Sequence, residues 1–245
     1  MADKEVLKQS LENIINNIDE FESGDIDWYS SQIDLNMYDD EEAEDYRSTD
    51  QYLMTEAFKY PELHPLMRKV VEVITKTNYS VGEVWDEDEE HAGTNAALLF
   101  ALANKEDVML YADFIATNDL NHPVYQEEDW PEVFDKWGCC EETLRLLITI
   151  TCVPGQYFSL DEYWEEFAEY LQQDGKIDEL FRQLHLFIQY VLAHNIPCRD
   201  TTDMLNEKLP SLLPDEDEET LEHIAQNFND YPDGPVPPTL EMLKK

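Results

Sequence analysis

The chain has 245 residues, of which 56 are acidic and 16 are basic, so its formal net charge at pH 7 is −40. Nucleic acids and anionic membrane surfaces are bound through Lys and Arg, so this charge argues against direct nucleic-acid binding and against membrane association. Hydrophobic residues make up 42% of the chain and aromatic residues 11%, which is enough apolar surface for a packed core despite the self-repulsion.

The first part of the chain, residues 1–90, is predicted to form three helices, because apolar residues recur there at helical spacing. Residues 3–22 form the first, residues 40–60 the second, which Pro61 stops, and residues 62–77 the third. The expected buried stripes are Val6, Leu7, Leu11, Ile14, Ile15, Ile18 and Phe21 in the first, Tyr46, Leu53, Met54, Ala57 and Phe58 in the second, and Leu66, Val70, Val73 and Ile74 in the third.

The middle part, residues 91–198, is predicted to contain three helical hairpins. Residues 95–117, 127–151 and 160–195 each read as helix, tight turn, helix. The turns fall at residues 104, 138 and 175, so they are 34 and 37 residues apart. This period is typical of stacked hairpins of the HEAT or tetratricopeptide type, although an irregular helical bundle with hairpins of similar size fits equally well.

The last part, residues 199–245, is expected to hold two short helices, at 201–209 and 218–229, and then a Pro-rich extended arm. Only seven glycines are present in the chain, which disfavours a turn-rich β fold. We therefore predict an all-α protein that forms a single acidic helical domain over residues 1–245.

A partner-binding surface is predicted where the connections between hairpins would meet. If the hairpins stack, the segments 79–91, 118–129 and 153–160 converge on one edge. The residues expected to bind a partner there are Trp85, Asp86, Glu87, Asp88, Glu89, Glu90, Tyr125, Glu127, Glu128, Asp129 and Trp130. Aromatic side chains supply anchoring area in protein recognition, and carboxylates steer a basic partner. Two alternatives stay open: the run 86–90 is a solvated loop, and Trp130 is a core residue followed by Pro131 at a helix start.

No catalytic, cofactor or metal site is predicted. The histidines are scattered, and the chain has no HExxH, no zinc-type Cys/His spacing, no P-loop, no GxGxxG and no GxSxG. The run 86–90 lacks the EF-hand pattern. Trp137 and Trp164 are expected in the core, and His185 and His194 are expected to be buried or at its rim.

The cysteines, Cys139, Cys140, Cys152 and Cys198, form no CxxC motif and are expected to be free thiols in a reducing cytoplasm. Cys139 and Cys140 start a predicted helix after Gly138, and a helix N-terminus lowers a thiol pKa, but Glu141 and Glu142 would raise it, so structural thiols are expected. The N-terminus lacks the pattern of a signal peptide, and no apolar run approaches the roughly 20 residues of a membrane span.

The alternation ALLFALANKEDVMLYADFIATNDLNHPVYQ followed by KWGCCEETLRLLI resembles the helical, HEAT-like immunity proteins of bacterial secretion and contact-dependent toxin systems, over residues 91–195. The resemblance implies a small cytoplasmic protein without catalysis, which binds and blocks one cognate toxin domain. A basic toxin would suit the charge of this chain.

Three other functions remain open at this stage. A DNA mimic would occupy the DNA-binding groove of another protein, and it would need carboxylates spaced like phosphates. A general helical interaction scaffold and an enzyme of unknown type are the others.

Overall fold

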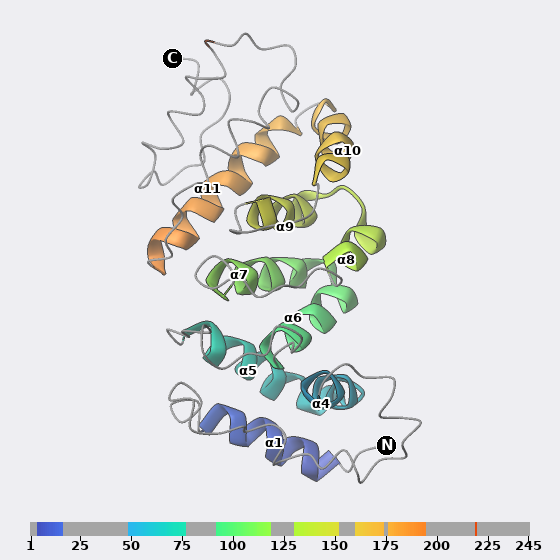
Figure 1. Ribbon diagram of the computed structural model, residues 1–245, viewed down its shortest axis with the longest axis vertical. Coiled ribbons are helices and arrows are strands. Elements are labelled where there is room, and N and C mark those ends of the chain that lie inside the picture. The colour runs from blue at the N-terminus through green and yellow to red at the C-terminus, as the bar shows by residue number, and fades with distance from the viewer. Residues whose placement is uncertain are drawn as a thin grey trace. The chain divides into compact units, whose positions relative to one another are not determined.

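The computed structural model describes residues 4–16, 49–76, 92–118, 130–151, 160–173, 176–194 and 219 (Figure 1). Within these ranges the chain forms nine α-helices and two short 3-10 helices, and no strand. The all-α prediction is therefore confirmed. The choice between stacked hairpins and an irregular bundle stays a prediction, as does the single domain, and the elements expected at 201–209, 218–229 and 231–245 lie outside the described helices.

The chain divides into two compact units. Unit 1 comprises Met1–Phe114 and Val124–Asp129, and unit 2 comprises Ile115–Pro123 and Trp130–Lys245. The helix α7 (Val108–Asn118) contributes to both units, because the division falls between Phe114 and Ile115.

Unit 1 contains α1 (Lys4–Asn16), α4 (Thr49–Phe58), η2 (Pro61–Leu63), α5 (His64–Lys76), α6 (Ala92–Ala103) and η4 (Lys105–Asp107). The helix α6 packs against α4 and α5, and α1 packs against the same two helices. The buried side chains come from every α-helix of the unit, among them Leu7, Leu11, Leu53, Met54, Met67, Val70, Phe100 and Tyr111.

The α5 helix is tied to the turn after α6 by Arg68. Its guanidinium donates two hydrogen bonds to Asp107, at 2.8 and 2.7 Å, and lies 4.0 Å from the centre of the Phe100 ring. Asn104 donates a further hydrogen bond to Asp107 at 3.1 Å. The hydrogen bonds from Arg68, above all, hold the pKa of Asp107 below its usual value.

All three expectations about buried stripes in unit 1 were partly wrong. Val6 is 41% exposed, although Leu7, Leu11 and Ile14 of the same helix are buried. In the second helix Phe58 is only half-buried, although Leu53, Met54 and Ala57 are buried. In the third helix Leu66 and Val73 are only half-buried, because the buried face follows a different helical row. That row consists of Leu63, Met67, Val70, Val71 and Ile74.

Unit 2 contains α8 (Trp130–Trp137), α9 (Glu141–Thr151), α10 (Asp161–Leu171) and α11 (Ile177–Ala193). The helix α9 contacts each of the other three, and all of its residues from Thr143 to Thr151 are buried (Figure 1). A helix that is covered on every side needs partners for its polar groups. Thr149 and Thr151 meet this need by donating to the carbonyls of Arg145 and Leu147, at 3.0 and 2.7 Å.

The predicted helix pairs around residues 104 and 138 are confirmed, with Asn104 between α6 and η4 and with Gly138 between α8 and α9. Gly138 has a φ of +59°, the left-handed conformation that ends many helices and favours glycine. The third pair, α10 and α11, also forms as predicted, while its turn residue Gly175 lies outside the described residues.

Candidate functional site

The α10 helix is strongly two-sided. Its inner side carries Trp164, Phe167, Ala168 and Leu171, all buried. The indole N–H of Trp164 donates to the hydroxyl of Thr151 on α9 at 3.0 Å, so this large side chain is buried without an unpaired polar group. The inner side therefore fixes which residues of α10 face the solvent.

The outer side of α10 is a continuous row of carboxylates. These are Asp161, Glu162, Glu165, Glu166 and Glu169, all exposed. With 3.6 residues per turn they fall within an arc of about 140° around the helix axis. The helix contains no Lys or Arg, and Glu162, Glu165, Glu166 and Glu169 form no ion pair with a described residue.

An aromatic ring lies at the edge of this row. Tyr163 is half-buried, and its ring centre is 4.7 Å from that of Phe134 and 5.2 Å from that of Trp130. Burial raises the pKa of the Tyr163 hydroxyl, and the nearby charges of Asp135, Glu162 and Glu166 raise it further. Asp135 of α8 therefore belongs to the same charged surface, which we call the acidic face: Asp135, Asp161, Glu162, Glu165, Glu166 and Glu169, bordered by Tyr163.

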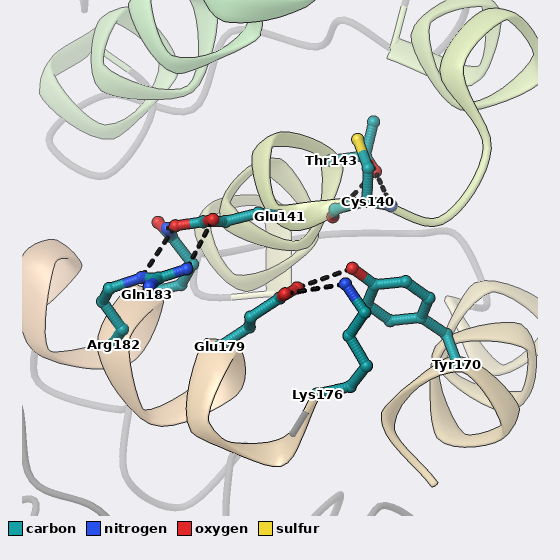
Figure 2. Close-up of polar contacts among 8 residues, drawn as sticks. All are labelled: Cys140, Glu141, Thr143, Tyr170, Lys176, Glu179, Arg182 and Gln183. Atoms are coloured by element: carbon teal, nitrogen blue, oxygen red, sulfur yellow. Dashed lines mark hydrogen bonds and ion pairs between the residues drawn. The ribbon is translucent and has the colours of Figure 1, made fainter. Parts of the chain in front are cut away.

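Two described basic residues of unit 2, Lys176 and Arg182, form ion pairs with carboxylates of the same unit. Glu141, in the first turn of α9, accepts hydrogen bonds from Arg182 Nε at 2.8 Å and from Gln183 Nε2 at 2.6 Å (Figure 2). Glu179 accepts from Lys176 at 2.7 Å and from the Tyr170 hydroxyl at 2.6 Å.

Arg145 of α9 is 3% exposed, and its guanidinium lies 5.1 Å from the centre of the Phe187 ring. Among the described Lys and Arg residues of unit 2, Lys136 is the exposed residue that forms no ion pair with a described residue. It lies 5.4 Å above the ring of Trp137, its neighbour in sequence. The acidic face is therefore largely uncompensated within the described part of its own unit.

The adjacent cysteines lie in the turn from α8 to α9. Burial raises the pKa of the Cys139 thiol to about 11, and the charges of Glu166 and Glu169 contribute to that increase. Cys140 precedes the first residue of α9, and its backbone N–H donates to the Thr143 hydroxyl at 3.0 Å, as in a helix capping box. This environment suits structural thiols and opposes nucleophilic chemistry at neutral pH.

The binding residues predicted from the sequence lie mainly outside the described residues. These are Trp85, Asp86, Glu87, Asp88, Glu89, Glu90, Tyr125, Glu127, Glu128 and Asp129. Trp130 is described: it begins α8, is 6% exposed and packs edge-on against Phe134 and Tyr163. Of the two alternatives for Trp130, this packing favours the core residue over the exposed anchor.

The other predicted side chains agree in part. Trp164 is 1% exposed and His185 is 2% exposed, so both are buried as expected. His194 lies in the exposed turn at the end of α11 and stacks on Tyr190 at 4.1 Å. Trp137 is only half-buried, so its assignment to the core was wrong. It stands at the last position of a short helix, next to the turn at Gly138.

The acidic face of α10 was not predicted from the sequence. Its carboxylates are separated by apolar residues, whereas those of the run 86–90 are consecutive. A usable signal was present. No Lys or Arg occurs between Arg145 and Lys176, while acidic residues recur throughout residues 161–169. Combined with the apolar positions 164, 167, 168 and 171, this pattern predicts a helix with one face made of carboxylates.

Within the described ranges, no group of three or more His, Cys, Asp or Glu side chains is arranged to hold a metal ion. None of the described helices combines the length and the apolar character needed to cross a bilayer. Comparison with protein-family models, with curated proteins and with solved structures found no match to the chain.

Proposed function

We propose that this protein is a cytoplasmic, non-catalytic binding protein that holds a basic protein domain against its acidic surface. The resemblance to helical immunity proteins suggests a cognate bacterial toxin or effector as that domain, neutralised by direct contact. The observation that carries the proposal is the acidic face of unit 2, because its carboxylates are exposed and four of them lack ion-pair partners among the described residues.

The negative charge would mainly raise the association rate constant and would contribute less to the affinity. Uncompensated charge on a protein raises the rate of encounter with an oppositely charged partner, and the effect weakens as salt screens it. Residence time depends on buried aromatic and apolar contacts. Tyr163 is the described aromatic residue placed to make such contacts, since it is half-buried at the border of the acidic face.

The acidic runs at residues 86–90 and 127–129, predicted from the sequence to bind the partner, would add to the negative charge that attracts it. A basic partner would then be attracted by these two runs as well as by the acidic face. Because the carboxylates of α10 lie in a described helix and residues 86–90 lie outside the described residues, variants of α10 provide the more sharply designed test. Variants of residues 86–90 serve as the comparison.

The first experiment is retention of the partner on immobilised protein at low and high salt, followed by co-expression. The wild-type protein should retain a basic protein at low salt, release it at high salt and suppress its toxicity in the cell. A variant with Glu162, Glu165, Glu166 and Glu169 changed to Gln should lose much of the retention. A partner that is acidic, or equal retention by this variant, would contradict the proposal.

A DNA mimic is the second candidate, and one measurement on α10 favours it. The five carboxylates from Asp161 to Glu169 span nine residues, or about 12 Å of helix axis, so that one charge occurs on average per roughly 3 Å. One strand of duplex DNA carries a phosphate per about 3.4 Å of axis. Displacement of DNA from several unrelated DNA-binding proteins would support this candidate, whereas displacement from none would remove it.

A further inference from the structure

The carboxylates of α10 repel one another along the helix. On a helix, side chains three or four positions apart are neighbours, and like charges at this spacing destabilise it. Such pairs are Asp161 with Glu165, Glu162 with Glu165 and Glu166, Glu165 with Glu169, and Glu166 with Glu169. The helix has no Lys or Arg to offset these pairs.

The helix dipole makes negative charge less favourable in the second half of the helix than in the first. Negative charge in the first turn is favourable, because the N-terminus of a helix carries a partial positive charge. Asp161 and Glu162 lie there. Glu169 lies in the last turn, where the partial charge is negative and where α10 has no basic residue. Glu166 and Glu169 are therefore the like-charged pair nearest the C-terminal end of the helix, where negative charge is least favourable.

The buried side of the helix opposes this repulsion. Trp164 and Phe167 are each 1% exposed, and Trp164 is hydrogen-bonded to Thr151 of α9. At the C-terminal end, the Tyr170 hydroxyl donates to Glu179 of α11 at 2.6 Å (Figure 2). Two sets of contacts thus hold α10 in place while its outer charges favour its opening.

We infer that repulsion between its carboxylates makes α10 an electrostatically strained helix, whose local stability depends on the cations around it. Added salt, or a bound cationic protein, increases that stability. In the free protein at low salt, α10 opens more often than a helix with the same buried contacts and no charge repulsion would. Raising the salt concentration screens the repulsion and stabilises α10. The salt response holds whether or not the acidic face binds a protein, and a bound basic surface would act in the same direction.

The test uses the full chain at about 0.01 M and about 1 M NaCl, where the Debye lengths are about 30 and about 3 Å. Hydrogen exchange resolved by peptide should show slower exchange of the α10 amides at high salt. At low salt, the double variant Glu166→Gln with Glu169→Gln should slow this exchange about fivefold and raise Tm by roughly 3 °C. Gln and Glu have similar helix propensities, so the change isolates the charge.

The matched control is Asp161→Asn with Glu162→Gln, which removes the same charge from the other end of the helix. It should slow exchange less or accelerate it, because favourable contact with the helix N-terminus is lost. The inference is overturned if the 166/169 variant leaves the low-salt exchange of α10 unchanged or faster. It is also overturned if the two double variants stabilise the helix equally, or if the effect of the 166/169 variant is undiminished at high salt.

Discussion

Arg182 on α11 forms a bidentate ion pair with Glu141 at the start of α9, with Nε 2.8 Å from Oε1 and Nη2 2.5 Å from Oε2 (Figure 2). Gln183 adds a third donor to the same carboxylate at 2.6 Å. Glu141 is thus one of the few carboxylates of unit 2 with described cationic partners, and it links two helices that are far apart in sequence. The acidic residues of α10 differ from Glu141, since their side chains are exposed to solvent.

Neutralising Glu141 should therefore destabilise the protein, whereas neutralising Glu166 and Glu169 on α10 should not. Glu141→Gln removes a bidentate ion pair whose members are 34% and 43% exposed, so we expect a loss of about 0.5–1 kcal/mol in the free energy of unfolding. Urea unfolding measures this loss. Lys136→Met, which removes an exposed cation without an ion pair to a described residue, is the control and should change stability less.

Trp130 should behave as a core residue. Trp130→Ala removes a ring that is 6% exposed and in contact with Phe134 and Tyr163, so we expect a loss of roughly 3–5 kcal/mol in stability. Trp130→Phe keeps the aromatic packing and should cost less. If the alanine variant keeps its thermal stability but loses binding to the partner, Trp130 is instead the interface anchor that the sequence also allowed.

The sequence was informative about elements and less so about surfaces. Apolar residues at helical spacing were enough to place α6, α7, α8, α9, α10 and α11 and two of their turns, because burial of one helix face dominates local structure. The same rule could not choose between neighbouring rows on α5, where Leu66 and Met67 are both apolar and only packing decides which is buried. Nor could it show that Glu141 is paired while Glu166 forms no ion pair with a described residue, because the partner of Glu141 lies about 40 positions away.

The Arg68–Asp107 pair should make stability fall in acid. The pKa of Asp107 is lowered in the folded protein, so its contribution is fully present above its unfolded value near 3.8 and disappears as pH falls through the lower folded value. Asp107→Asn should therefore destabilise the protein at neutral pH. The gap between the variant and the wild type should shrink and close as the pH falls below 3.8 through the lower folded value. Urea unfolding measured across pH would contradict this account if the gap stayed constant.

Cys139 should be a slow nucleophile. With its pKa raised to about 11, only a very small fraction is thiolate at pH 8. Alkylation by iodoacetamide, followed by mass spectrometry of the modified peptide, should be about 100-fold slower in the folded protein than in urea. Cys139→Ser should leave partner binding intact. Rapid alkylation of the native protein at pH 7 would instead point to a reactive site at the α8–α9 turn.

The most direct test of the proposed function is the association rate constant with the purified partner, measured by stopped flow at low and high salt. Glu162, Glu165, Glu166 and Glu169 changed together to Gln should slow association about tenfold or more at low salt, with a smaller effect on dissociation. Neutralising residues 86–90 in a separate variant shows whether the predicted run shares this role. At high salt all three proteins should associate at similar rates. If the α10 variant associates as fast as the wild type at low salt, the acidic face of α10 does not steer the partner, and the account is contradicted.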